Sequence, residues 1–292
     1  MIKNLKSFKF TERANKAISR TGWYVFEGKT VNALAGNNTI TGTRNTGDNT
    51  WSDGIVNDGT IITGNGNNTF IGAGKGKAEG EGIGNYGLIK TGRGNDIISG
   101  TCNSDEAADG INNEGKIDVG SGNDRITGAA SGYKKLRPQF GSCSGICNEG
   151  TINTGSGKDI ITGSSPTFEY ATGIDNTGTI NTGSGKDIVD ALKGGFNGVD
   201  SDDFDKLTGR TYLGAGNDTL KGFGTGRFYG GTGKDKILFG QGKYKIRGST
   251  IVSGAVTMNV NEFEQIGGAN GGLFTFKNGT LKVNAAGVGT FV

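Results

Sequence analysis

Six short segments of the chain share the pattern Gly-x-Gly-x-Asp, which places a carboxylate at a fixed distance from two flexible residues. They end at Asp96, Asp124, Asp159, Asp187, Asp218 and Asp235, and the second glycine of each is Gly94, Gly122, Gly157, Gly185, Gly216 or Gly233. Glycine adopts positive φ at little cost, so successive carbonyl oxygens can point into one concavity. If such turns stack, carbonyls and carboxylates of neighbouring turns can together surround a hard cation that needs 6–8 oxygen ligands.

The composition favours calcium among the metals. The chain has no histidine, which removes the usual ligand of zinc and copper and leaves oxygen donors. Magnesium demands a stricter octahedron than a flexible carbonyl cage provides. The alternative is that each Asp caps its own turn by accepting backbone hydrogen bonds. That explains one turn well but six stacked turns poorly, because like charges would then align about 4.8 Å apart.

These turns belong to a longer repeat. Its clearest unit, GICNEGTINTGSGKDIITG, starts at Gly145, and related units start at Gly54, Gly82, Gly110 and Gly173. The starts are 28, 28, 35 and 28 residues apart. Repeats of this length are typical of solenoids, in which each unit buries its apolar face only against its neighbours.

Each unit is predicted to form three short strands separated by two turns and a loop of variable length. The apolar positions would then stack into three columns: Ile55, Ile83, Ile111, Ile146 and Ile174; Ile61, Ile89, Ile117, Ile152 and Ile180; and Ile98, Ile126, Ile161 and Val189. An Asn-x-Gly turn recurs as well, and its stacked amides should form an asparagine ladder through Asn57, Asn85, Asn113, Asn148 and Asn176. The sequence therefore predicts an all-β parallel solenoid, which explains how 32% apolar residues suffice for a chain with 58 glycines.

The repeat resembles the RTX, or hemolysin-type, calcium-binding repeat family, whose nonapeptide is GGxGxDxUx with U a large apolar residue. The best matches are LGAGNDTLK at 213–221 and GGTGKDKIL at 230–238. In that family the turns bind calcium and the x-U-x segments form strands of a parallel β-roll. The resemblance implies a calcium-binding role for all six Asp-containing turns.

Two departures from the family change the expected shape and occupancy. A period near 28 rather than 18 predicts a three-sided β-helix with one RTX-like corner per coil, passing into a roll near the C-terminus. Arg227 and Tyr244 stand where the family has Asp, which predicts metal along one edge only. Asn38 and Asn68 end two further copies, which should bind more weakly. Lysines that lower the negative charge directly precede three of the aspartates: Lys158, Lys186 and Lys234.

The ends of the chain depart from the repeat. Residues 1–30 should form an N-terminal cap, 31–248 the calcium-binding solenoid, and 249–292 C-terminal capping strands that cover open strand edges. The start of the sequence has no apolar run typical of a signal peptide, and no stretch is long enough to span a membrane. Cys102, Cys143 and Cys147 lack CxxC spacing, and the pattern allows either a Cys102–Cys143 disulfide or free thiols.

The function that these features favour is a calcium-binding structural or interaction protein, located outside the cell or on its surface. Metal binding would couple to folding, so the chain could be exported unfolded by type I secretion. Expected partners are calcium ions and an extracellular polysaccharide or cell surface. The net charge of +3 is small and scattered, which argues against nucleic acid.

Two other function classes remain open at this stage. A polysaccharide lyase or epimerase would need an Asp, Arg or Lys cluster beside the long loops, and YKKLR at 133–137 is the candidate. Because the solenoid uses nearly the whole chain and histidine is absent, we expect no enzyme. An ice-binding solenoid would need a flat array of outward threonines, and the outward positions of the second strand are too mixed. Adhesion through the variable loops stays open.

Overall fold

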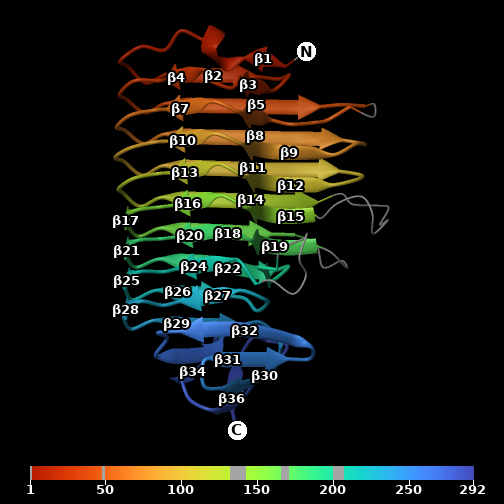
Figure 1. Cartoon of the computed structure of the whole chain (residues 1–292), viewed down its shortest axis with the longest axis vertical. Helices are drawn as coiled ribbons and strands as arrows, with labels where there is room; N and C mark the ends of the chain where they lie inside the picture. Colours follow the sequence, from red (N-terminus) through yellow and green to blue (C-terminus); the bar gives the residue numbers. More distant parts are fainter. Residues whose placement is uncertain (1, 48–49, 132–142, 166–170, 200–206) are drawn as a thin grey trace.

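The protein was analysed as a computed structural model that describes residues 2–47, 50–131, 143–165, 171–199 and 207–292. Figure 1 shows coils of β-strand stacked along the long axis, with the N-terminus at one end and the C-terminus at the other. About eight such coils follow one another, so the predicted parallel β-solenoid is confirmed.

Strands at equivalent positions of successive coils pair side by side into three long sheets. Sheet A holds β1 (Lys3–Asn4), β3 (Trp23–Val25), β6 (Ile55–Asn57), β9 (Gly80–Asn85), β12 (Ala108–Asn113), β15 (Cys143–Asn148), β19 (Ala171–Asn176) and β23 (Phe196–Asn197). Sheet B holds β2 (Lys16–Ser19), β5 (Thr39–Asn45), β8 (Thr69–Gly76), β11 (Ile97–Ser104), β14 (Arg125–Ser131), β18 (Ile160–Ser164), β22 (Ile188–Lys193), β26 (Thr219–Lys221), β29 (Lys236–Phe239), β33 (Gln265–Gly268) and β34 (Gly271–Thr275).

The third sheet and a short fourth one complete each coil. Sheet C holds β4 (Thr30–Asn32), β7 (Thr60–Ile62), β10 (Leu88–Lys90), β13 (Lys116–Asp118), β16 (Thr151–Asn153), β20 (Thr179–Asn181), β24 (Arg210–Tyr212), β27 (Arg227–Tyr229), β32 (Val256–Asn261), β31 (Thr250–Ser253), β30 (Gly242–Arg247), β35 (Gly279–Val283) and β36 (Gly289–Phe291). The corner between sheets C and B forms a narrow turn sheet of β17 (Ser156–Gly157), β21 (Ser184–Gly185), β25 (Ala215–Gly216) and β28 (Thr232–Gly233). This corner, which contains the Gly-x-Gly-x-Asp turns, runs along one edge of the stack (Figure 1).

The core is the set of isoleucine columns that the sequence predicts. Every member of the three columns is fully buried, and register pairs such as Ile83 with Ile111 and Ile111 with Ile146 join successive coils. Burying one such side chain contributes about 1.5–3 kcal/mol. The predicted asparagine ladder is confirmed too, because Nδ2 of each member donates to Oδ1 of the next at 2.7 Å in four successive links from Asn57 to Asn176.

The cross-section changes near the C-terminus. Sheet A ends at β23, and the coils that follow pass only from sheet C through the turn sheet into sheet B. The last two turn aspartates, Asp218 and Asp235, are accordingly 17 residues apart instead of 28. This two-sided segment matches the roll expected there.

Both ends of the core are covered. Strands β2 and β3 fall within the segment expected to be an N-terminal cap, yet they already pair in parallel with β5 and β6. Leu5, in the short 3-10 helix η1 (Leu5–Ser7), is fully buried at that end of the core. At the other end, β30 to β36 form mostly antiparallel pairs over the last coil. In the described part of the chain, no helix has the length and apolarity needed to cross a membrane.

The cysteines are free thiols in this structure. Cys102 and Cys143 are buried in a small second cluster with Ala108 and Ala130, where strands of sheets A and B extend beyond the main core. The Cys102–Cys143 disulfide that the sequence allows is thus not formed in this structure.

Candidate functional site

The six predicted aspartates form one continuous ladder at the corner between sheets C and B. Each is at most 1% exposed. The backbone N–H of each Asp donates to Oδ1 of the Asp one coil further on, at 2.7 to 2.8 Å, through Asp96, Asp124, Asp159, Asp187, Asp218 and Asp235. The structure thus brings together every aspartate that the sequence selects.

The ladder continues beyond the aspartates in both directions. At the N-terminal end Asn15, Asn38 and Asn68 occupy the same position, and the backbone N–H of Asn68 donates to Asp96 Oδ1 at 2.6 Å. At the other end the N–H of Asp235 donates to Glu264 Oε2 at 2.6 Å. Asn15 and Glu264 escaped the sequence analysis because no Gly-x-Gly precedes them. Their sequences share one feature with the other rungs, an apolar residue two positions later. These residues, Ala17 and Ile266, are in register with the buried apolar column of sheet B.

The close approach of stacked coils is enough to explain why the second of the two Gly positions in each turn pattern is glycine. Gly157 has φ +145°, and a Cβ added there would lie 1.6 Å from the carbonyl oxygen of Gly122 on the preceding coil. Its equivalents Gly94, Gly122, Gly185, Gly216 and Gly233 have φ between +139° and +157° and similar close contacts. The glycines are therefore required for the coils to approach, whether or not the turn holds a ligand.

The asparagine rungs show what surrounds the second side-chain atom of each rung. Nδ2 of Asn38 donates to the carbonyl oxygens of Leu34 and Gly36 in its own turn at 3.2 and 3.0 Å. It also donates to the Thr63 carbonyl and to Asn68 Oδ1 on the next coil at 3.1 and 3.2 Å. Asn15 repeats all four contacts. The position is thus a cage of oxygen acceptors, which the asparagine satisfies with its two N–H groups.

In the aspartate rungs an oxygen replaces that donor. Oδ2 is buried and has no hydrogen-bond partner in Asp96, Asp124, Asp159, Asp187, Asp218 and Asp235. Because Oδ1 makes the same ladder bond in both residue types, in-register stacking turns Oδ2 toward the acceptors that an asparagine would use. A bare carboxylate there faces mainly carbonyl oxygens, which is costly in a buried place. The hydroxyl groups of Thr91, Thr154 and Thr182 lie beside Asp96, Asp159 and Asp187 and lower the pKa of these carboxyl groups in part. A proton on the carboxyl group or a cation beside it would satisfy each rung.

The electrostatics of the ladder agree with this requirement. Burial, as the largest cause, together with the charges of Asp159 and Asp96 raises the pKa of Asp124 to about 7, although the hydrogen bond from the Asp96 N–H opposes this shift. Burial likewise raises the pKa of Asp187 to about 7 and of Asp218 to about 6. The pKa values of the remaining three aspartates of the ladder are also raised, first by burial.

A cation in the ladder would rely on carbonyl oxygens as much as on carboxylates. Among the residues described, no three Asp, Glu, His or Cys side chains converge as a metal-binding group. Successive rungs can supply two carboxylates, with turn carbonyls as the remaining donors. This all-oxygen set suits a hard cation with flexible geometry.

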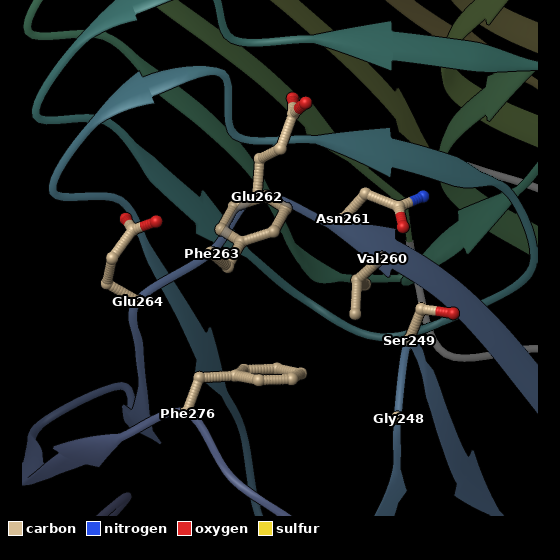
Figure 2. Close-up of a pocket in the computed structure, with 8 residues that line it drawn as sticks. All are labelled: Gly248, Ser249, Val260, Asn261, Glu262, Phe263, Glu264 and Phe276. Carbon is tan, nitrogen blue, oxygen red and sulfur yellow. The ribbon is translucent and has the colours of Figure 1, made fainter.

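A pocket of about 250 Å³ lies at the C-terminal end of the ladder. Figure 2 shows the carboxylates of Glu262 and Glu264 well apart, both pointing toward the top of the view, while the Phe276 ring extends in the direction of Ser249. The two acidic side chains do not converge, so this pocket adds no second metal site to the ladder.

Neither Tyr244 nor Arg227, which the sequence analysis also singled out, belongs to the aspartate ladder. Tyr244 is buried in the core, where its ring stacks on Phe239 at a centroid distance of 4.2 Å. Arg227 starts strand β27 of sheet C and is partly exposed. The YKKLR cluster at 133–137 lies outside the described residues.

A second group of carboxylates, which the sequence analysis missed, lies on the outer face of sheet A. Glu81 and Asp109 are register partners on β9 and β12. Asp53 Oδ1 accepts the Glu81 N–H at 3.1 Å, and Asp109 Oδ1 accepts the Ser144 N–H at 2.9 Å. Asp175 on β19 is in register with Cys147, three positions beyond the Asp109–Ser144 pair, and its charge contributes to the raised pKa of Asp109. We refer to Asp53, Glu81, Asp109 and Asp175 as the acidic row. Its signal in the sequence is weak, because outward positions vary from coil to coil.

One polar atom of this row and one beside it lack hydrogen-bond partners. Glu81 Oε1 accepts bonds from Tyr86 Oη at 2.7 Å and Asn112 Nδ2 at 2.8 Å, but its buried Oε2 has none. Ser144 is fully buried, and its hydroxyl also lacks a partner. Burial raises the pKa of Glu81 to about 7 and of Asp109 to about 8. Perturbed carboxyl groups grouped in this way are typical of functional sites.

Comparison of the chain with protein families, with curated proteins and with solved structures gave no match.

Proposed function

We propose that the protein is a calcium-binding structural protein, in which calcium ions occupy the aspartate ladder and make the solenoid rigid. The observation that carries this proposal is the series of six buried Oδ2 atoms without a hydrogen-bond partner. Each stands where the asparagine rungs place a donor against a cage of oxygens. A cation at that place would supply the positive charge that the asparagine N–H groups supply in the first coils.

Calcium suits the cage better than other common cations. The donors are carboxylate and carbonyl oxygens, and their number and flexibility match a preference for 6–8 ligands. Likeness of the turns to the RTX nonapeptide supports the same assignment. The ligands of each ion would come from adjacent coils, so binding would join coils that repel one another without it. Such a chain could be exported unfolded and fold in calcium-rich surroundings outside the cell.

Isothermal titration calorimetry of metal-free protein at pH 7.5 should detect several calcium ions per chain. Six carboxylates carry a charge of −6, which about three divalent ions would neutralise. Magnesium should bind more weakly. The matched control is a chain with Asn at all six ladder positions, since the first three rungs already contain Asn. Equal heats for the two proteins would contradict the proposal.

A second candidate function rests on the acidic row. A polysaccharide lyase needs a base that removes the proton from C5 of a uronic acid while an acid protonates the departing oxygen at C4, leaving a C4–C5 double bond. Neighbouring carboxyl groups of different pKa suit these two roles. Glu81 and Asp109 are adjacent, and the orphaned Glu81 Oε2 and Ser144 Oγ favour a polar ligand there.

Incubation with uronic acid polymers tests this candidate. An active protein should release unsaturated products that absorb ultraviolet light, and Glu81→Gln or Asp109→Asn should reduce the rate at least about 100-fold. Glu106→Gln, an exposed position outside the acidic row, should leave the rate unchanged. Absence of product from a folded, calcium-loaded protein would rule out the lyase.

A further inference from the structure

Two arginines and two tyrosines stand side by side on the outer face of sheet C, in the segment where the solenoid becomes two-sided. Arg210 on β24 is the register partner of Arg227 on β27, and Tyr212 is the partner of Tyr229. The residue between them on each strand is buried, so the flanking side chains share the outer face. The two tyrosine rings stack at a centroid distance of 4.8 Å and an angle of 15°.

Among the residues that the structure describes, neither arginine has an acidic partner in its register. On the adjacent strands their neighbours are the uncharged Thr179 and Asn259. Only two ion pairs occur within the described segments, Lys116–Asp118 and Lys221–Asp190, and neither includes these arginines. Like charges at directly opposite positions of a sheet are destabilising. An anion held between the two guanidinium groups would remove that repulsion.

A pocket of about 350 Å³ opens beside the pair. Both arginines line it, together with the hydroxyl-bearing residues Thr177, Thr179 and Thr208. Hydroxyl groups both donate and accept hydrogen bonds, as sugar hydroxyls do. The surface therefore combines an anion site, hydroxyl partners and an exposed aromatic side chain in Tyr212, which is 37% exposed.

From this combination we propose that the outer face of sheet C around Arg210 and Arg227 binds an acidic polysaccharide. The carboxylate or sulfate of one sugar unit would lie between the guanidinium groups, which form paired, charge-assisted hydrogen bonds with such anions. The apolar face of a sugar ring would pack on Tyr212. A polysaccharide fits better than nucleic acid, because a phosphate backbone is usually tracked by an extended basic stripe, whereas this site has two cations.

Fluorescence titration with an oligogalacturonate of about six units tests the proposal on the full chain in calcium. Arg227→Gln and Arg210→Gln should each weaken binding about tenfold or more, because each removes one charged half of the anion site. Tyr212→Ala should weaken it several-fold. Arg125→Gln, an exposed arginine on sheet B, is the matched control and should bind as the parent does.

Three outcomes would overturn the proposal: equal affinity for a neutral oligosaccharide of the same length, equal affinity of the Arg227→Gln and Arg125→Gln proteins, or tighter binding of a single-stranded oligonucleotide. Circular dichroism of each variant separates loss of binding from loss of fold. Neutralising one arginine should leave the melting temperature unchanged or raise it, because it removes a like-charge contact. Polysaccharide binding at this site can be tested separately from calcium binding in the aspartate ladder, because the Arg227→Gln protein should bind calcium as the parent does.

Discussion

Removal of calcium should cost the solenoid most of its stability at pH 8 and much less at pH 5. At pH 8 the ladder carboxyl groups lose their protons, and six buried Oδ2 atoms then face carbonyl oxygens without a counter-charge. At pH 5 Asp124, Asp187 and Asp218, whose pKa values are about 7, 7 and 6, keep a proton that donates to the same oxygens. Calcium and the proton are thus alternative ways to satisfy one ladder.

The direction of the pH effect follows from the raised pKa values. Asp124 and Asp187 have a pKa of about 7 in the folded protein against an ordinary value of 3.8. Between these values the folded chain holds protons that the unfolded chain has released, so stability of the metal-free protein falls as the pH rises. The contribution is complete below about pH 4 and is lost as the pH passes 7. Calcium should reverse this trend, because it binds the ionised form.

Thermal unfolding followed by circular dichroism, in chelator and in calcium at several pH values from 4 to 8, checks this expectation. The melting temperature in chelator should decline with pH, and the two curves should separate increasingly above about pH 6. Sodium chloride at equal ionic strength serves as the control, since simple screening would act without calcium. A melting temperature in chelator that rises toward pH 8 would contradict the proton-or-cation account of the ladder.

The periodic part of the fold could be predicted from the sequence because every coil repeats the same spacing of apolar residues and turns. A column such as Ile61, Ile89 and Ile117 is buried only if the coils stack in register, and the Asn-x-Gly turns demand the same stacking. For Gly157 the sequence analysis selected the right residue but gave only part of the reason, which was its freedom to adopt positive φ. Its lack of a side chain is required by the carbonyl of Gly122 on the preceding coil, a contact that no single turn reveals.

Features that depend on contacts between coils were harder to predict. Glu264 enters the ladder although no glycine turn precedes it, because the capping strands bring it into register beneath Asp235. The acidic row is built from outward positions that no repeat constrains, such as Glu81 and Asp109. The pairing of Arg210 with Arg227 arises because sheet A ends, which shortens the coil and places two unrelated segments in register.

Replacing a single ladder aspartate should distinguish the role of Oδ1, which accepts a backbone hydrogen bond, from the proposed role of Oδ2 in holding a proton or a cation. Asp159→Ala removes Oδ1, the acceptor of the Asp124 backbone N–H at 2.8 Å. That buried donor would be left unsatisfied, so the free energy of unfolding should fall by about 1–3 kcal/mol whether or not calcium is present. Asp159→Asn keeps Oδ1 and puts an amide N–H group in place of Oδ2, as at Asn68.

The asparagine variant should therefore behave in the opposite way to the alanine variant when calcium is absent. In chelator at pH 8 we expect Asp159→Asn to be more stable than the parent, because its amide donates to oxygens that repel an ionised carboxylate. In calcium the order should reverse, and calorimetry should show weaker binding or fewer ions. Chemical unfolding of the three proteins in both buffers measures these differences.

This comparison distinguishes the proposed metal ladder from a purely structural one. If the aspartates only anchored backbone amides through Oδ1, Asp159→Asn would match the parent in calcium as well as in chelator, since that bond is retained. A variant that is stabilised in chelator but not in calcium requires something at Oδ2 that calcium supplies. The same reasoning explains why the first three rungs are asparagine: Asn15, Asn38 and Asn68 would hold their coils together before any ion binds, giving the metal-dependent coils an ordered edge on which to stack.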